Sequence, residues 1–245
     1  FFRIDWIAET ITVAGTGAVE LGGGVNAVEQ QLKAAREAEE ELLRSFIASM
    51  QELRIDAYRS ARDVLLEEAE KGGPLYAYFD RMERVSVRYG EHTVELQKSL
   101  PFFGDDGFIP LLVNAGTDPG NFPEYPGYVF SRPFTGLVID ARGLGKAPSA
   151  FPRVWDQSHI LVYSAELMDR DQYRRWGSVQ FTDDPFYRND RERVGSNPLR
   201  IVAYPDERLI ETDLAIRTGD ARVLLQHEES RRSLVEGRVI VILDG

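Results

Sequence analysis

The stretch TGLVIDARGLG, residues 135–145, is a short apolar run that ends in a charged turn with two glycines. Gly136 to Ile139 combine aliphatic and β-branched residues, a pattern typical of a buried strand. The strand is followed by Asp140, Arg142, Gly143 and Gly145. A half dominated by helical patterns precedes this stretch, and a half in which short strands and helices alternate follows it. The stretch therefore divides the chain.

The first half predicts a strand, a long helix and a hairpin. Ile4 to Val19 is interpreted as extended, and the helix begins after Asn26 as N-cap and runs to about Lys71 without glycine or proline. Apolar residues recur at spacings of three and four, which indicates one amphipathic helix. They are Val28, Leu32, Ala35, Leu42, Phe46, Met50, Leu53, Ala57, Ala61 and Val64. We expect this helix to stop at Gly72–Pro74 and to pack on its own sheet, the alternative being a rod that meets a second copy. The hairpin lies at Val85 to Leu100.

Residues 101–133 contain six prolines, many glycines and several aromatic residues. This density of proline and glycine predicts a connection without regular structure. Large rings are usually buried, so we expect them to pack on their own domain or on a neighbouring subunit.

After the connection, strands or extended pieces are expected at 136–139, 148–156, 158–165, 179–181, 198–204, 213–217 and 238–243, with helices at 169–176, 184–194 and 220–234. This alternation favours a mixed sheet with helices. The predicted fold class is α+β, in which a long amphipathic helix packs on a small sheet and a second, mixed α/β sheet domain follows. The predicted boundaries are 1–100 for the first domain, 101–133 for the connection and 134–245 for the second domain.

Composition excludes several function classes. The net charge of −11 and the isoelectric point near 4.9 argue against a nucleic-acid-binding surface, which needs clustered Lys and Arg. No apolar run is long enough to predict a membrane span. The absence of cysteine excludes disulfides and thiolate chemistry in this sequence. Because the chain begins Phe1-Phe2 without methionine, we expect an exported protein whose signal peptide has been removed, or a trimmed chain.

No pattern predicts catalysis, a cofactor or a metal. His92, His159 and His227 are scattered without the spacing of a zinc or triad site. The glycines at 22–24 lack the lysine or spacing of a phosphate-binding loop. Asp140 and Asp244 each follow an apolar strand, where a carboxylate can bind a cation or act as a general acid or base, although turn and cap roles are commoner there.

Six stretches together resemble a known family. In the second half they are TGLVIDARGLG with the following Phe151–Val154, RVGSNPLRIVA (193–203) and EGRVIVILDG (236–245). In the first half they are ITVAGTGAV (11–19), LRIDAYRSARDVL (53–65) and TVELQKSLPFFG (93–104). As a set they resemble exported bacterial proteins that carry the FlgP/FlgT-type outer-membrane lipoprotein domain, a flagellar-associated envelope family. The chain lacks the lipid-acceptor cysteine of that domain.

The resemblance implies a non-enzymatic structural or scaffolding protein of the cell envelope, periplasmic or outer-membrane-associated. Such a protein assembles with itself into a ring, disk or filament and associates with flagellar or other envelope proteins. The candidate self-association residues are Leu42, Phe46, Met50, Leu53, Phe122, Tyr125, Tyr128 and Phe130. The candidate structural residues of the motifs are Asp140, Arg142, Gly143, Gly145, Arg193, Gly195, Asn197, Pro198 and Asp244. Two alternatives remain open: a soluble periplasmic ligand- or calcium-binding module with its pocket near Asp140, Arg142 and Asp244, and an enzyme that uses Asp140.

Overall fold

A computed structural model describes residues 1–19, 26–83, 86–128 and 130–245, which form two compact units. The first unit consists of residues 1–53, 60–102 and 106–112, and the second of residues 54–59, 103–105 and 113–245. Helices and sheets occur in both units, so the predicted α+β class is confirmed. The glycines at 22–24, considered above as a phosphate loop, lie outside the described residues.

The sheet of the first unit is antiparallel, with the strand order β1-β2-β4-β3. Its strands are β1 (Phe2–Asp5), β2 (Thr10–Ala18), β3 (Ser86–Tyr89) and β4 (Thr93–Pro101). The predicted hairpin is confirmed as β3 and β4. The single extended segment expected at the N-terminus is instead two strands, because Asp5 closes a turn by accepting the Ala8 N–H at 2.9 Å.

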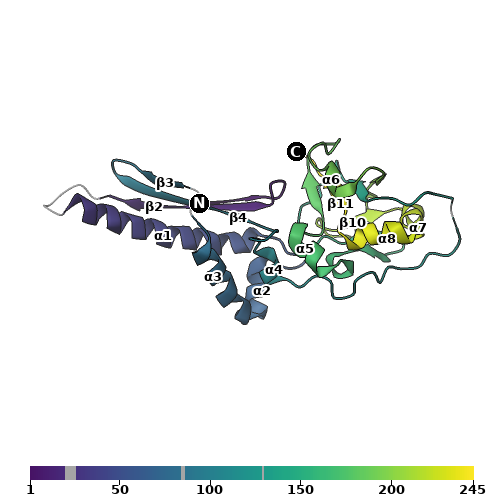
Figure 1. Cartoon of the computed structure of the whole chain (residues 1–245), viewed down its shortest axis with the longest axis horizontal. Helices are drawn as coiled ribbons and strands as arrows, with labels where there is room; N and C mark the ends of the chain where they lie inside the picture. Colours follow the sequence, from purple (N-terminus) through teal and green to yellow (C-terminus); the bar gives the residue numbers. More distant parts are fainter. Residues whose placement is uncertain (20–25, 84–85, 129) are drawn as a thin grey trace. The chain divides into compact units, whose positions relative to one another are not determined.

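Helix α1 (Ala27–Glu52) lies along β2 and β4 and covers one face of this sheet (Figure 1). Asn26 caps it as predicted, accepting the Val28 N–H at 3.0 Å. The helix lies very close to β2: a Cβ added at Gly15 would lie 2.0 Å from the Ala38 carbonyl oxygen. The expectation of a long amphipathic helix packed on its own sheet is therefore confirmed.

The predicted length of this helix is wrong. Helix α1 ends at Glu52, and a turn at 54–59 follows, in which Asp56 accepts the N–H groups of Tyr58 and Arg59. Ser60 and Asp63 then form a reciprocal capping box that starts a new helix. The helices that follow are α2 (Ala61–Glu67), the 3₁₀ turn η1 (Ala69–Lys71), α3 (Gly72–Arg81) and α4 (Ile109–Leu112). Gly72 to Pro74 begin α3 and do not end α1.

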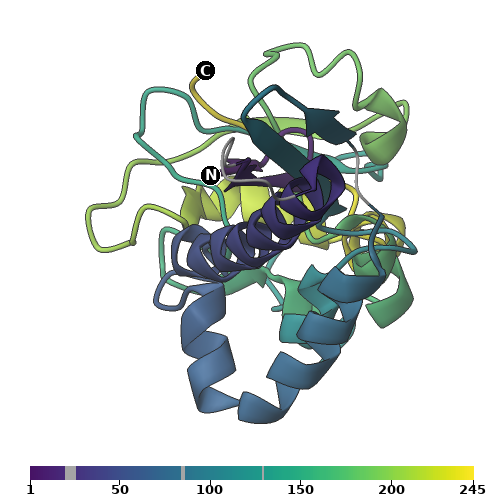
Figure 2. The same cartoon turned by 90° about the vertical axis from the view of Figure 1, so that its left-hand side faces the viewer.

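Helices α2 and α3 lie on the side of α1 that faces away from the sheet and diverge like the arms of a V (Figure 2). Aromatic rings fill the core of the first unit. The rings of Phe46 and Phe79 stack with centroids 4.7 Å apart, and Phe108 meets Phe46 edge-on at 6.0 Å. Helix α1 is thus fixed between the sheet and α3.

The second unit contains a parallel four-stranded sheet with the order β8-β11-β5-β9. Its strands are β5 (Leu137–Asp140), β8 (Gln180–Thr182), β9 (Leu199–Val202) and β11 (Val239–Ile242). Every residue of the central strands β5 and β11 is buried, as expected for a parallel sheet covered on both faces. The strand predicted at 136–139 and the C-terminal strand are confirmed.

A smaller sheet has the order β10-β6-β7. Its strands are β6 (Val154–Asp156), β7 (Leu161–Tyr163) and β10 (Leu214–Ile216), and the helices of this unit are η2 (Ala165–Leu167), α5 (Arg170–Trp176), α6 (Arg191–Val194), α7 (Thr218–Leu225) and α8 (Glu228–Val235). The helix predicted at 184–194 is present only as α6. The single helix predicted at 220–234 is two helices, broken at Gln226 and His227.

The proline-rich stretch is divided between the units. Residues 101, 102 and 106–112 belong to the first, and 103–105 and 113–133 to the second. Regular structure in its described part is limited to the end of β4 and the short α4. None of the described helices combines the length and the apolar character needed to cross a bilayer.

Candidate functional site

Asp140 ends β5 at the carboxyl edge of the parallel sheet, where strand ends lie side by side. Its carboxylate accepts two hydrogen bonds from the Arg142 guanidinium, at 2.8 and 2.7 Å, and one from Arg200 of β9 at 3.2 Å. These bonds, chiefly those from Arg142, lower the pKa of Asp140 to about 2. Such a group is a poor general base near neutral pH, because an effective base has a pKa close to the working pH.

Asp244 lies two residues beyond β11 and closes the turn after β5. Both of its carboxylate oxygens accept the Gly143 N–H at 3.0 Å. Gly143 and Gly145 have φ values of 77° and 60°, which a side chain would strain. The carboxylates of Asp140 and Asp244, predicted as candidate cation ligands, thus accept hydrogen bonds from other residues of the chain. Among the described residues, no group of three or more His, Cys, Asp or Glu side chains is arranged to hold a metal ion.

The residues singled out around 193–198 make structural contacts. Arg193 is buried and donates to three carbonyl oxygens, those of Trp176, Gly177 and Gly237, at 2.7 to 2.9 Å. Asn197 donates its side-chain amide to the Pro133 carbonyl at 3.0 Å.

The two residues beside Asn197 shape the chain before β9. Gly195 has a φ of 72°, and a Cβ there would meet the Thr135 side chain at 2.9 Å. Pro198 directly precedes β9. This motif therefore joins the start of β5 to the start of β9.

The candidate self-association residues of α1 do not form a free surface. Leu42, Phe46, Met50 and Leu53 are each at most 3% exposed, because they fill the core of the first unit. The sequence pattern identified the apolar face of the helix correctly, but this face packs within the chain.

An apolar groove opens between α1, α2 and α3, with a volume of about 520 Å³. Ile47 of α1, Leu66 of α2 and Tyr76 of α3 line it and are 60%, 70% and 57% exposed. Sequence reasoning missed this groove, because a single helix to residue 71 leaves no V-shaped space between helices. The capping box of Ser60 and Asp63 was the signal that could have found it.

The aromatic residues predicted for self-association in the connection lie on one extended segment, called here the strap (residues 116–128 and 130–134). Its first part donates backbone hydrogen bonds from Gly116, Asp118 and Gly120 to the carbonyls of the η2 turn, each at 3.0 Å. Phe122 and Tyr125 are half-buried, whereas Tyr128 and Phe130 are 72% and 90% exposed.

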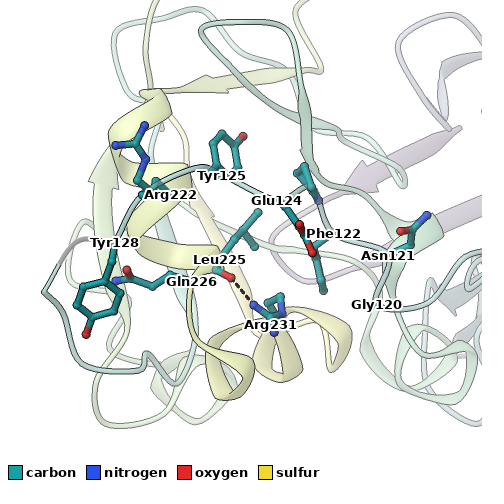
Figure 3. A pocket seen from close by; sticks show the side chains of 12 residues that line it. Gly120, Asn121, Phe122, Glu124, Tyr125, Tyr128, Arg222, Leu225, Gln226 and Arg231 are labelled. Atoms are coloured by element: carbon teal, nitrogen blue, oxygen red, sulfur yellow. Dashed lines mark hydrogen bonds between the residues drawn. The ribbon is translucent and has the colours of Figure 1, made fainter.

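The strap and helices α7 and α8 enclose a pocket of about 560 Å³ (Figure 3). The strap contributes Phe122, Glu124, Tyr125 and Tyr128. The helices contribute Arg222, Leu225 and Arg231, and the break between them contributes Gln226. Sequence reasoning missed the helical residues, because 220–234 was interpreted as one helix with a solvated face. The break between α7 and α8 brings His227 into contact with the strap instead, its Nε2 lying 3.0 Å from the Ser131 carbonyl oxygen.

Comparison with known families gives a match within the second unit. Residues 136–245 match the family described as the second domain of Treponema pallidum Tp0624. The match runs from β5 to the C-terminus, so it includes Asp140, Arg193 and Asp244, and it leaves out the strap. It covers less than half of the chain and is therefore a likeness of this region. A search of curated proteins gave no match.

Proposed function

We propose that this chain is a non-enzymatic structural or scaffolding protein of the bacterial cell envelope that assembles with itself into a ring, disk or filament. The observation that carries the proposal is the apolar groove between α1, α2 and α3. An exposed groove lined by aliphatic and aromatic side chains is typical of a protein–protein contact. It lies in the unit that holds the long helix.

The same unit offers a matching surface for a second copy. Val28 and Leu32, one helical turn apart near the start of α1, are 59% and 57% exposed. We call this pair the ridge. The ridge is about 25 Å from Ile47 along the helix, at 1.5 Å per residue. The ridge of one copy inserted into the groove of the next makes a head-to-tail contact.

Head-to-tail contacts use two different surfaces on each copy. They repeat until a ring closes, or continue as a filament when the rotation does not close. A groove and a ridge on one unit therefore support the kind of assembly that we propose. The edge strands β1 and β3 are only four residues long, so they offer little backbone for assembly through sheet edges.

The proposed location follows from the resemblance of the six sequence stretches to the FlgP/FlgT-type domain. That resemblance supports an envelope position, with the flagellar motor as the proposed site of assembly. The family matched by residues 136–245 has a description that names neither a location nor an assembly.

Two variants test the head-to-tail contact by light scattering and electron microscopy of the purified chain. Leu66→Glu places a charge in the groove and Leu32→Glu places one on the ridge, so each variant alone is expected to remain monomeric. An equimolar mixture is expected to form dimers and nothing larger, because one intact groove meets one intact ridge. Tyr89→Ser, an exposed change on β3, serves as the control and is expected to assemble like the wild type. A wild-type chain that stays monomeric at high concentration contradicts the proposal.

A further inference from the structure

Hydrogen bonds hold the strap in place on both sides of the pocket that it covers. Before the pocket, the Gly120 N–H bonds the Leu167 carbonyl at 3.0 Å. After it, the Ser131 hydroxyl contacts the side chains of Gln226 and His227, and the Phe134 N–H donates to Ser230 at 2.9 Å. Between these anchors, the Tyr125 hydroxyl donates to Asp156 at 3.0 Å.

Two arginines line this cavity, Arg222 of α7 and Arg231 of α8. The Nε atom of Arg222 is buried and has no hydrogen-bond partner in the described part of the chain. Arg231 uses its Nη1 on the Leu225 carbonyl at 2.6 Å. Arg232 and Arg238 pair with Glu228 and Glu236, whereas Arg222 and Arg231 form no ion pair within the described part of the chain. The Arg222 Nε is closed to solvent, so an anion in the pocket would meet the Nη end of that side chain. Two guanidinium groups without an acidic partner favour an anionic group in the pocket. Guanidinium groups bind carboxylate and phosphate especially well.

The other residues that line the pocket suit a ligand with a ring that carries polar groups. Phe122, Tyr125 and Tyr128 supply ring faces on the strap side (Figure 3). The Tyr125 hydroxyl is committed to Asp156, and burial, followed by that bond, raises the pKa of Tyr125. The tyrosine therefore stays protonated and offers its ring. Glu124 supplies a carboxylate that accepts hydroxyl or amide N–H donors, and Asn121 supplies an amide.

We propose that the pocket between the strap and helices α7 and α8 binds a sugar that carries a carboxylate or phosphate group. The positive charge of the arginines attracts the acid group, the aromatic side chains cover the sugar ring, and Glu124 and Asn121 accept or donate hydrogen bonds to its hydroxyl and amide groups. A pocket of about 560 Å³ has the size of a small-molecule site. This site lies wholly in the second unit and does not depend on self-association through the first.

The binding test uses two pairs of sugars that differ in one acid group, titrated into the full chain by calorimetry. The pairs are N-acetylmuramic acid with N-acetylglucosamine, and glucose 6-phosphate with glucose. The acidic member of at least one pair is expected to bind about 10- to 100-fold more tightly than its neutral partner, the ratio typical of a charge-assisted contact. The binding pair identifies the acid as carboxylate or phosphate. Equal binding within both pairs, or no binding by any sugar at 10 mM, overturns the proposal.

Arg222→Met removes the guanidinium charge while keeping a chain of similar length, and it is expected to abolish the preference for the acidic sugar. Arg232→Met is the matched control, because Arg232 lies on α8 beside Arg231 but is exposed and paired with Glu228 at 3.4 Å. Tyr128→Ala removes an exposed ring from the pocket rim and is expected to weaken both members of the binding pair about equally. Thermal unfolding of each variant separates lost binding from lost folding. Equal losses in Arg222→Met and Arg232→Met contradict the assignment.

Discussion

Asp140 accepts hydrogen bonds from two arginines, and one of them comes from a neighbouring strand. The bond from Arg142 is local, since the two residues are two positions apart and both belong to the turn after β5. The bond from Arg200 depends on the pairing of β5 with β9, in which Val138 lies opposite Arg200. The carboxylate therefore links a turn to the sheet beside it, a structural role.

Replacing Asp140 with asparagine is expected to lower the free energy of unfolding by about 2 kcal/mol at neutral pH, the range of hydrogen bonds to charged groups. The folded pKa of about 2 lies below the unfolded value of about 3.9. The stabilisation is therefore complete above about pH 4 and is lost as the pH falls through 2. Urea unfolding between pH 7 and pH 2 measures the effect, with the exposed Asp105→Asn as control. A deficit that stays constant with pH would show that the charge plays no part.

At this scale the sequence predicted part of the site. Asp140 and Asp244 each follow an apolar run, so their places at strand ends could be expected from the pattern. The partner of Asp140 on β9 could not, because the order of strands in a parallel sheet is set by packing and not by local sequence. Arg222 and Arg231 were missed for the same reason: their place in a pocket depends on the strap, which lies about a hundred residues earlier in the chain.

Among the secondary-structure elements, the contact between α1 and β2 depends on two glycines. Gly15 and Gly17 lie on the same face of β2, because residues two positions apart in a strand share a face. The carbonyl of Ala38 lies against Gly15, and that of Ala34 lies against Gly17. Any side chain at either position would push the helix off the sheet.

Gly17→Ala is expected to destabilise the first unit by about 3 kcal/mol, because the new Cβ would lie 1.7 Å from the Ala34 carbonyl oxygen and neither backbone can yield without moving the helix. Gly73→Ala is the matched control. Its Cβ would meet nothing within 4 Å, and alanine favours helix α3 by about 0.5 to 1 kcal/mol. Chemical unfolding of both variants measures the difference. Similar stabilities would mean that helix and strand are not in close contact.

The end of α1 was the main error in predicting elements. Residues 53–60 contain no glycine or proline, so the apolar spacing continued without an interruption that periodicity could detect. The helix stops because Asp56 and Ser60 give the backbone other partners, as short polar side chains do at turns and caps. The glycines at 72–73 were interpreted as a stop, but there the chain simply begins another helix.

For the molecule as a whole, the two units are not consecutive segments of sequence. Residues 54–59 follow α1 directly, yet they belong to the second unit. The carbonyls of Arg54 and Ile55 accept the N–H groups of Ala150 and Phe151 at 3.0 and 2.7 Å, and Arg54 pairs with Glu211 at 2.6 Å. The predicted boundaries at 100 and 134 describe consecutive segments of sequence, and local sequence patterns do not indicate contacts of this kind.

Ile55→Ala is therefore expected to destabilise the second unit although residue 55 lies between two helices of the first. Ile55 is fully buried, and truncating such a side chain costs about 2 to 5 kcal/mol. Hydrogen exchange of the intact protein tests this, with amides of β5 and β11 reporting on the second unit and amides of β2 and β4 on the first. Tyr58→Ala, at a 77% exposed position in the same segment, is the control and should leave both sets protected. Faster exchange confined to β2 and β4 would assign residues 54–59 to the first unit. Faster exchange in β5 and β11 is expected if the buried Ile55 side chain supports the parallel sheet, in which β5 ends at Asp140.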